Sequence, residues 1–511
     1  MKQLLIFFLA TLLLLSGCGR TDNEIVDPGW EQYQQDQLES APEQLPQEQA
    51  FPETFSMAYH KDTTLDPITC SEGIQQDIAA LLYEGLFTLD SSFEPNPLLC
   101  ESHSWDETGL VCTLNIRRDV LFSDGTPLTA ADAAASLRRA AASERYGYRL
   151  RQMTAVTSNR EQQVVITLTS PNRAFLSLLD IPVVKIGTEG QIVPVGTGPY
   201  LFVTGSEGNT LQANSDWWQK KNLPVSTIHL VHAKDQDTAA YLFSSRRVNL
   251  LTADPTSNQV PISGQTEETH RATTLLQFVG FNTRTGIFSS ARARMAFSQG
   301  LQRDMLTSAF LSSHAQTAQF PISPLSTLYP KDLEREYSYD ETLSTITALS
   351  QGADTTETLT LLVNEENSFR LSSAKYIAEN LSLGNWQIEV KALPWEEYVL
   401  ALTAGDFDLY YGEVRLTADW DLTDLIGTGG VMNYGGYTDP LTDFLLQSFV
   451  SSDNRQAATR QLCSHLQSTV PIAPICFRDY TVMTHPQMVE GLAPTPGNTF
   501  TALENWTIHL K

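Results

Sequence analysis

The chain has 511 residues, of which 41% are hydrophobic and 18% charged, a composition that supports folded domains and excludes a wholly disordered protein. Its formal net charge of -26 argues against a nucleic-acid-binding surface, because phosphate recognition depends on Lys and Arg. The acidity by itself does not identify a substrate.

The first 17 residues predict a secretory signal sequence. Lys2 precedes an almost wholly apolar run over 4–15, which is shorter than the roughly 20 residues that a membrane span needs. The run ends in Leu-Ser-Gly-Cys, which resembles a bacterial lipobox and implies that Cys18 is lipidated as the first residue of the mature chain. A plain signal peptide ending in small residues is the alternative. Residues 18–50, rich in Gln, Glu and Pro, are predicted to form a disordered tether.

From Phe51 onward the pattern becomes that of a folded domain. The predicted elements are strands over 54–59, 111–117 and 164–169 and helices over 74–83 and 130–142. Thr129 and Asp132 form a capping-box pattern ahead of the second helix. The Gly196-Thr197-Gly198-Pro199 turn predicts backbone angles that most residues reach only with strain.

The second half alternates strands with helices. The predicted strands cover 276–282, 359–363, 386–391 and 471–475, and the predicted helices cover 291–306, 368–383, 395–404 and 456–470. This alternation argues for an α/β lobe.

Four motifs of this chain resemble those of a known family. They are Tyr83-Glu84-Gly85-Leu86, Ser104-Trp105, the segment 122–132 and the turn 196–200. In order and spacing they are similar to the bacterial extracellular solute-binding proteins of family 5, which serve peptide, nickel and related ABC importers. The resemblance implies an α/β, two-lobed fold like that of periplasmic binding proteins, of type II, with an extra subdomain in lobe I.

The resemblance also implies a domain arrangement. Lobe I would comprise 51–281 and 477–511, with an inserted subdomain at about 76–190, and lobe II would comprise 282–476. The chain would cross between the lobes twice, and two crossings form a natural hinge.

One segment of lobe II matches the family's ligand site. In peptide-binding members a Trp-x-Ala-Asp-aromatic segment supplies an aspartate that pairs with the α-amino group of the ligand, and the matching residues here are Asp419 and Trp420. A desolvated ammonium group needs such an acceptor. The alternative is that Asp419 only turns the backbone at a strand end. Leu416 stands where the family has Trp, and Arg415 is an additional charge near the pocket or in solvent. With Thr417, these residues are the candidate ligand contacts.

The cysteines suggest one disulfide. Five remain after the lipobox cysteine, and Cys463 and Cys476 lie on consecutive elements, where a bond would contribute about 3 kcal/mol. We predict this pair in an oxidising compartment. Cys100 and Cys112 flank a hairpin, but counting from its turn places Cys112 opposite about His103, so they are the weaker candidate.

No enzyme motif, metal-ligand spacing or cofactor motif is found in the sequence, which predicts a protein that is not an enzyme, with no cofactor and no metal. The predicted function is capture of a solute by closure of the two lobes, followed by delivery to an ABC permease and its ATPase. A short peptide is the favoured solute, ahead of a nickel complex or a sugar. The alternative is a sensor or adaptor of the same fold. We expect a monomer, lipid-anchored on the extracytoplasmic side, either on the outer face of the cytoplasmic membrane or in the periplasm.

Overall fold

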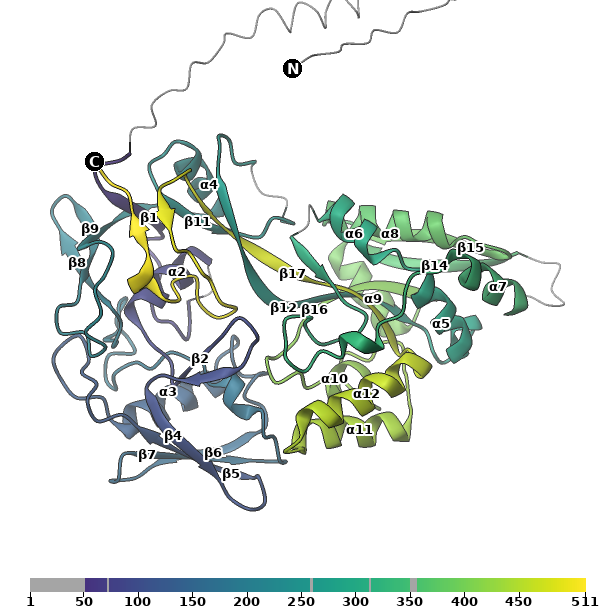
Figure 1. Ribbon diagram of the computed structural model, residues 1–511, viewed down its shortest axis with the longest axis horizontal. Helices are drawn as coiled ribbons and strands as arrows, with labels where there is room; N and C mark the ends of the chain where they lie inside the picture. The colour runs from purple at the N-terminus through teal and green to yellow at the C-terminus, as the bar shows by residue number, and fades with distance from the viewer. Residues whose placement is uncertain (1–50, 71–72, 258–260, 312–313, 350–355) are drawn as a thin grey trace, which may run out of the picture. The chain divides into compact units, whose positions relative to one another are not determined.

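The computed structural model describes residues 51–511 except 71–72, 258–260, 312–313 and 350–355 (Figure 1). The predicted signal sequence, Cys18 and the tether lie outside the described residues. None of the helices in the described part is both long and apolar enough to cross a membrane.

One large mixed sheet organises the described residues. Its strand order is β15-β14-β16-β12-β17-β11-β1-β10-β9-β8, and β13 pairs with β17 off this path. Its strands are β1 (Phe55–Tyr59), β8 (Tyr200–Gly205), β9 (Gly208–Ala213), β10 (Thr227–His232), β11 (Leu250–Ala253), β12 (Glu267–Phe281), β13 (Ala315–Thr317), β14 (Glu357–Asn364), β15 (Trp386–Leu393), β16 (Leu409–Arg415) and β17 (Ile472–Thr484).

The smaller sheets lie outside this path. A four-stranded antiparallel sheet has the order β4-β5-β7-β6, and two pairs, β2-β3 and β18-β19, complete the strands. Their bounds are β2 (Phe87–Leu89), β3 (Pro95–Pro97), β4 (Cys100–Trp105), β5 (Val111–Ile116), β6 (Met153–Ser158), β7 (Gln163–Leu168), β18 (Val489–Glu490) and β19 (Thr507–Ile508).

The helices fall into two groups, one around each end of the large sheet, except that α3 of the first group packs against β6 and β7 of the small sheet (Figure 1). Those of the first end are α2 (Gly73–Leu82), α3 (Ala130–Ala141) and α4 (Gln236–Ser244). Those of the second end are α5 (Ala291–Gly300), α6 (Arg303–Phe310), α7 (Tyr339–Leu349), α8 (Ser368–Leu381), α9 (Trp395–Ala404), α10 (Thr423–Ile426), α11 (Pro440–Ser451) and α12 (Arg455–Thr469). Short 3-10 helices cover Phe175–Leu178, Ile287–Ser289, Lys331–Leu333 and Leu503–Asn505.

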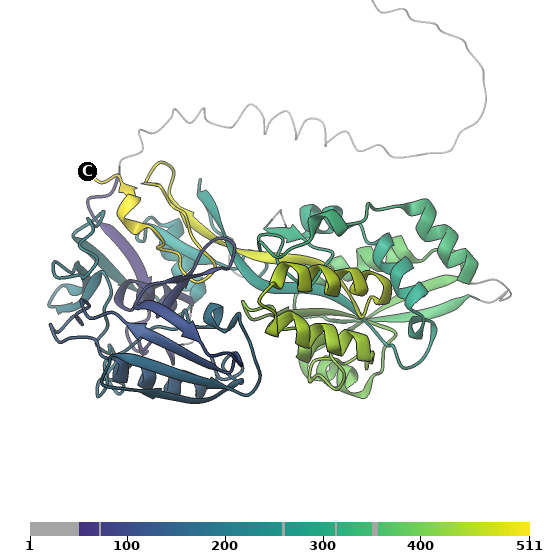
Figure 2. The same cartoon turned by 60° about the horizontal axis from the view of Figure 1, so that its bottom comes forward.

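Strands β12 and β17 run through both ends of the sheet and are the two chain crossings (Figures 1 and 2). They pair antiparallel from Glu267 with Thr484 to Gly280 with Ile472. At one end β17 also pairs with β11, and at the other end β12 pairs with β16 from Leu275 onward. We call the part with β1–β11 lobe I and the part with β13–β16 and α5–α12 lobe II. The predicted bounds of the lobes and of the inserted subdomain stay predictions, because both crossing strands belong to both lobes.

Two of the four family motifs of lobe I meet at a single buried carboxylate. Glu84 is 8% exposed and accepts hydrogen bonds from Thr197 Oγ1 (2.8 Å), Trp218 Nε1 (2.7 Å), Gln219 Nε2 (2.8 Å) and Trp217 Nε1 (3.2 Å). Burial raises the pKa of Glu84, and these donors oppose the rise. The acidic side chain of the Tyr83-Glu84-Gly85-Leu86 motif is thus bonded to the threonine of the 196–200 turn and to the polar groups at 217–219, which ties these segments together.

The glycines of the predicted turn are required for a reason other than backbone angle. Neither Gly196 nor Gly198 has a positive φ, so the predicted strained conformation is wrong. A Cβ on Gly196 would lie 2.3 Å from the carbonyl O of Leu82, and one on Gly198 would lie 2.4 Å from the carbonyl C of Leu82. The turn passes directly against the end of α2, and any side chain there would collide with backbone.

Most predicted elements are confirmed, but one predicted helix is divided. The capping box at Thr129 and Asp132 is present, and α9 has the predicted bounds. The predicted helix 291–306 is two helices, because Leu301 has extended backbone angles that end α5. The guanidinium of Arg303 at the start of α6 then donates from Nε to the Pro474 carbonyl over 2.8 Å.

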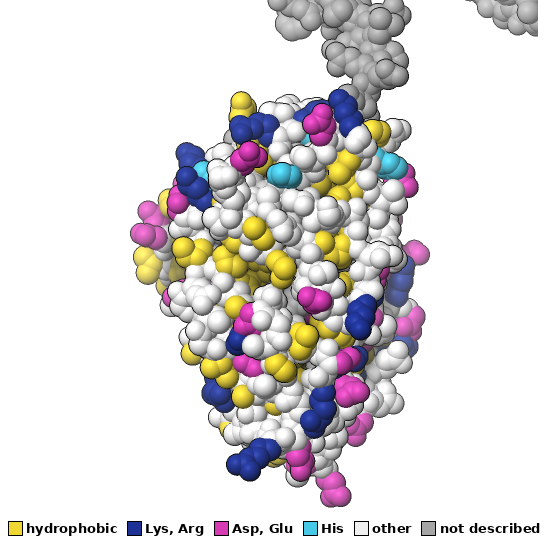
Figure 3. All heavy atoms as spheres, turned by 90° about the vertical axis from the view of Figure 1, so that its left-hand side faces the viewer, with side chains coloured by type: hydrophobic (Ala, Val, Ile, Leu, Met, Phe, Trp, Pro, Cys, Tyr) yellow, Lys and Arg dark blue, Asp and Glu magenta, His cyan; other side chains and the backbone are white. Residues whose placement is uncertain are grey.

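Lobe II has a hydrophobic cluster on each face of its sheet. Alternate residues of β12 belong to different clusters, Phe278 to one and Val279 to the other, as the two-residue period of a strand requires. Helices α11 and α12 lie side by side over the sheet (Figure 2). On the face of lobe I seen in Figure 3, acidic and basic side chains are interspersed with apolar ones.

Candidate functional site

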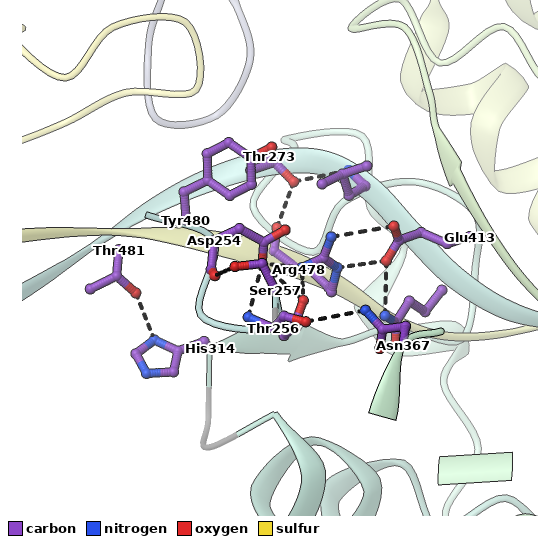
Figure 4. Close-up of polar contacts among 12 residues, drawn as sticks. Asp254, Thr256, Ser257, Thr273, His314, Asn367, Glu413, Arg478, Tyr480 and Thr481 are labelled. Carbon is purple, nitrogen blue, oxygen red and sulfur yellow. Dashed lines mark hydrogen bonds and ion pairs between the residues drawn. The ribbon is translucent and has the colours of Figure 1, made fainter. Parts of the chain in front are cut away.

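Charged side chains gather where the crossing strands pass between the lobes (Figure 4). Arg478 on β17 is 3% exposed; its Nε donates to Glu413 Oε2 and its Nη1 to Asp254 Oδ1, each over 2.6 Å. Nη1 also donates to Thr256 Oγ1. Asp254 and Thr256 follow β11 in lobe I, whereas Glu413 is on β16 in lobe II. One buried guanidinium therefore joins the two lobes.

Side chains from α8 and β12 of lobe II also contact this network. Arg370 Nη2 on α8 lies 3.0 Å from Glu413 Oε1, and Gln277 Nε2 on β12 donates to Oε2 over 2.9 Å. Asn367, the N-cap residue of α8, donates to the carbonyl O of Thr256 over 3.1 Å. Each buried charge thus has partners of opposite sign or hydrogen-bond donors, which is the condition for keeping it away from water.

The environment of Arg478 favours its charged form. Burial opposes the charge, but Glu413 and Asp254 outweigh burial and raise the pKa of the guanidinium above its ordinary value. For Asp254, burial would raise the pKa, but the bonds from Arg478 and Thr256 lower it below its ordinary value. Arg478 and Asp254 therefore each favour the charged form of the other.

The candidate residues beside Asp419 have different surroundings. Leu416 and Trp420 are 6% and 1% exposed and belong to a hydrophobic cluster of lobe II. The Trp420 ring packs edge-on against Phe93 of lobe I and Phe477 of β17, with centroid distances of 5.1 and 5.7 Å. Trp420 has a φ of 60°, in the left-handed region that is uncommon for a bulky residue. Packing accounts for both residues, and their contact with a ligand stays a prediction.

Asp419 is buried and already has hydrogen-bond donors. It is 2% exposed and accepts from Asn172 Nδ2 over 2.8 Å and from Thr417 Oγ1 over 2.5 Å. Arg455 donates to its carbonyl O over 2.6 Å. Asn172 lies in lobe I, so this carboxylate also joins the lobes. Its predicted contact with a ligand ammonium group stays a prediction.

The next two aspartates contact lobe I as well. Arg151 Nη2 lies 2.8 Å from Asp421 Oδ2 and 3.2 Å from Asp424 Oδ2. The hydroxyl of Tyr148 donates to Asp424 Oδ2 over 2.7 Å. The segment after β16 is therefore an acidic edge of lobe II facing basic and hydroxyl groups of lobe I.

Arg415 is exposed at the end of β16. Its Nη2 donates to the hydroxyl of Tyr480 on β17 over 3.1 Å. The sequence left open whether Arg415 lies near a site or in solvent. In the structure its side chain lies beside the crossing strands and is also accessible to solvent.

The predicted disulfide is wrong. Cys463 and Cys476 are both free, buried thiols. Cys463 on α12 belongs to the same cluster as Phe278, whereas Cys476 on β17 belongs to the same cluster as Val279, which lies on the other face of the sheet. Consecutive elements suggested proximity, but the sheet itself separates the two sulfur atoms.

The hairpin pair is also unbonded. Cys100 and Cys112 are free and buried. Cys112 lies opposite Trp105, and His103 lies opposite Leu114, so the predicted register was wrong by two residues. The connection is longer than the count from the turn assumed, because six residues, 106–111, separate Trp105 from its partner Cys112.

Sequence reasoning missed Arg478, Glu413 and Asp254. A signal was available for Arg478, because it stands with Asp479 inside an otherwise apolar strand, where charges are costly unless they are paired. No sequence signal indicates that Asp254 contacts Arg478, because the two residues are 224 positions apart in the chain. Only the crossing of the strands brings them together.

A cavity of about 310 Å³ lies elsewhere in lobe II. It is bounded by α5, the start of α6, the residues around Phe320 and Tyr337, and the start of β17. None of the charged residues of the crossing network lines it. In the described part of the chain, no three His, Cys, Asp or Glu side chains are arranged to hold a metal ion.

The chain matches the family model of the bacterial extracellular solute-binding proteins, family 5, over residues 94–426. The chain belongs to this family. Its members are substrate-binding proteins of ABC importers, and this receptor is one of them.

Relatives and solved structures agree with this assignment. The glutathione-binding protein GsiB of Escherichia coli (strain K12) is 23% identical over 424 residues, which cover 76% of this chain and 82% of GsiB. The structure of HbpA2 from Haemophilus parasuis has a TM-score of 0.75 at 18% identity and covers 89% of this chain and 100% of HbpA2. AppA from Bacillus subtilis, in complex with a nonapeptide, has a TM-score of 0.61 at 19% identity, with 90% and 99% covered.

A further similar structure is the murein tripeptide binding protein MppA in its unliganded open form. It has a TM-score of 0.73 at 17% identity and covers 90% of this chain and 98% of MppA. These likenesses show the same two-lobed fold in each protein.

Proposed function

We propose that this receptor binds a short peptide or a peptide-like solute. The observation that supports the proposal is that side chains of both charges, contributed by both lobes, meet at the crossing strands. They are Arg271, Arg415 and Arg478 together with Asp77, Asp254 and Glu413. Arg415 is exposed beside these buried pairs, and a solute that carries an ammonium and a carboxylate group offers charges of both signs to the two lobes. The relatives named for glutathione, a murein tripeptide and a nonapeptide are consistent with this class.

In this proposal the protein catalyses no reaction and acts by a change of conformation. The bonds from Asn172 to Asp419 and from Arg151 to Asp421 already join the lobes. A solute with groups for both lobes would bind the closed form better than the open form and would increase its population. The closed form would then dock on the permease, whose ATPase drives import.

Asp419 has two possible roles in this mechanism. Its bond from Asn172 supports a positioning role, because it fixes a lobe I side chain beside the segment after β16. Direct binding of an α-ammonium group would require that group to share or replace the Asn172 donor. The half-buried guanidinium of Arg455 beside Asp419 makes a second cation there less favourable.

We further propose that the mature protein is anchored through a lipid on Cys18. Residues 18–50 would then be the tether that connects the anchor to the folded domain. This places the receptor on the extracytoplasmic side of the cytoplasmic membrane, beside its permease.

The solute class can be tested by thermal unfolding of the mature protein against di- to pentapeptides, chelated nickel and oligosaccharides. A ligand of the native state raises the midpoint by mass action, with about 2.7 kcal/mol of stabilisation at 100 times Kd. We expect peptides to raise it. A midpoint that responds to the nickel chelate or to an oligosaccharide but to no peptide would contradict the proposal.

Asp419→Asn separates the two roles of this residue. If it binds the ammonium group, the variant should lose affinity for peptides with a free amino terminus and keep its affinity for N-acetylated peptides. If it only positions Asn172, both kinds of peptide should be affected equally.

A further inference from the structure

The cavity of lobe II combines an apolar wall with a polar, exposed side. Its volume is about 310 Å³, at the small end of the range of about 300–1,000 Å³ that is typical of ligand pockets. Buried apolar residues that line it include Leu301, Phe320, Ile426, Leu466 and Ile472. Its exposed lining residues are Asp304, Arg335, Glu336 and Tyr337. The volume suits one small organic molecule rather than a chain of several residues.

One guanidinium lines this cavity and is held in place by neighbouring polar groups. Arg303 donates from Nε to the Pro474 carbonyl O over 2.8 Å. Its Nη1 donates to the Ser298 carbonyl O and its Nη2 to Ser298 Oγ, each over 2.9 Å. A guanidinium has five N–H donors, so two remain, one on each terminal nitrogen. The fixed side chain therefore has bonding capacity left for a ligand.

The charge of Arg303 forms no ion pair with a carboxylate of the described residues. Burial lowers the pKa of this guanidinium to about 10, whereas Tyr329, Glu334 and Asp304 favour its charged form. Glu334 accepts a hydrogen bond from the Tyr329 hydroxyl over 2.5 Å, and Asp304 is exposed. Both carboxylates thus act on Arg303 from beyond ion-pair distance, and all three side chains line the same cavity.

Separated charges of both signs favour an amphoteric ligand. A carboxylate on the free N–H groups of Arg303 makes charge-assisted bonds and offsets the burial of the guanidinium. An ammonium group on the same ligand has acceptors in Glu334 and Asp304, whereas an anion without an ammonium group is repelled by them. The buried wall is apolar. An α-amino acid with an apolar side chain has these three parts, and one molecule is small enough for a cavity of this volume.

The cavity also borders the helix that contacts lobe I. Ile426, the last residue of α10, lines the cavity. Asp424 of the same helix accepts from the hydroxyl of Tyr148 over 2.7 Å and lies 3.2 Å from Arg151 Nη2, and both of these residues belong to lobe I. A ligand that packs against Ile426 therefore stabilises the position of α10 in which Asp424 contacts lobe I.

We propose that this cavity is a second ligand site, which binds a free amino acid with an apolar side chain. Arg303 binds its carboxylate, Glu334 and Asp304 its ammonium group, and the apolar wall its side chain. The bound amino acid favours contact between the lobes through α10, so it acts as an effector of solute capture. The site is separate from the crossing network, none of whose charged residues lines the cavity. This inference goes beyond the proposed function and does not depend on the class of solute bound at the crossing.

The first test is thermal unfolding of the mature protein with L-leucine, 4-methylpentanoate or isoamylamine. The second compound lacks the ammonium group of leucine, and the third lacks its carboxylate. L-leucine should raise the midpoint by about 3 °C at 100 times its Kd, and neither analogue should do so at the same concentration. No rise with L-leucine, or an equal rise with either analogue, would refute the site.

Variants test whether leucine binds in the cavity. Arg303→Gln should bind L-leucine about tenfold or more weakly, because a charge-assisted bond is lost. Gln299→Trp adds a large side chain to the cavity from α5, leaves Arg303 in place and should abolish the stabilisation. The matched control is Arg292→Gln on the same helix, which removes an exposed arginine outside the cavity and should respond as the wild type does. Gln299→Trp is decisive if Arg303→Gln does not fold. A wild-type response of the folded Gln299→Trp variant would overturn the proposal.

Calorimetry distinguishes this site from the solute site. Trialanine is titrated into the wild type with and without saturating L-leucine. Leucine in the cavity should tighten trialanine binding by about fivefold, the small end of typical coupling between two sites. Competition between the two would place leucine at the crossing and would overturn the site, whereas an unchanged affinity would refute the coupling through α10. If trialanine does not bind, the proposed solute class fails, and the first two tests still decide whether the cavity binds leucine.

Discussion

Replacing Arg478 by Met should destabilise the whole fold, because this side chain connects both lobes. Met has a similar length and keeps the packing of the aliphatic part, but removes the charge from Glu413 and Asp254. Breaking a buried ion pair by removing one partner costs about 3–5 kcal/mol, since the other charge stays buried without compensation.

The structure places the expected loss at the lower end of this range. Glu413 keeps two partners, Arg370 at 3.0 Å and Gln277 at 2.9 Å. Asp254 has a side chain that is 24% exposed and can be hydrated. We therefore expect about 3 kcal/mol. With an unfolding entropy of about 2.1 cal/mol/K per residue over residues 51–511, this corresponds to a midpoint lower by about 3 °C.

The effect should depend on pH in one direction. The folded-state pKa of Asp254 lies below its ordinary value of 3.8, so its contribution to stability is present above that pH and is lost as the pH falls through the folded pKa. Arg478→Met removes the first partner that lowers this pKa. The difference in midpoint between the wild type and the variant should therefore be constant near neutral pH and should shrink below about pH 4.

The assay is scanning calorimetry of both proteins, with two controls. Arg478→Lys keeps the charge but cannot bond two carboxylates at once through a planar guanidinium, so its unfolding midpoint should lie between those of the wild type and Arg478→Met. Arg460→Met makes the same chemical change in an exposed pair with Asp332 and should cost at most about 1 kcal/mol. An Arg478→Met midpoint within the error of Arg460→Met would refute the assignment of this network as a connection between the lobes.

Two further predictions concern the core of each lobe. Gly198→Ala should destabilise lobe I by about 1–3 kcal/mol or more, because the new Cβ would lie 2.4 Å from the backbone of Leu82. The control is Gly190→Ala, whose Cβ has no heavy atom within 4 Å and which should leave the free energy of unfolding by denaturant unchanged. In the denatured protein without reductant, a thiol reagent should label both Cys463 and Cys476, and protection of both would contradict their separation by the sheet.

Much of the fold was predictable because its local signals agree. The capping box at Thr129 and the bounds of α9 follow from short patterns that neighbouring residues alone satisfy. The prediction of one helix over 291–306 was wrong because the apolar spacing continues through Leu301. The chain breaks the helix there, and α6 then packs separately against the rest of lobe II.

The candidate site was less predictable for a physical reason. Asp419 and Trp420 were found through the resemblance to the family, yet their donors and ring partners, Asn172 and Phe93, come from another lobe. A motif identifies a residue but not the distant groups that already contact it.

The sequence by itself determined the family, the succession of strands and helices in each lobe, and the residues that the motifs share, because these depend on short-range patterns in the chain. The tertiary structure decided which charges meet at the crossing and which do not. It placed Arg478 beside Asp254, put Arg415 beside Tyr480, and separated Cys463 from Cys476. The reason is that β12 and β17 carry their side chains past segments hundreds of residues away in the chain, and the strand register, with the loop after β11 and the start of α8, sets which of these partners come within bonding distance.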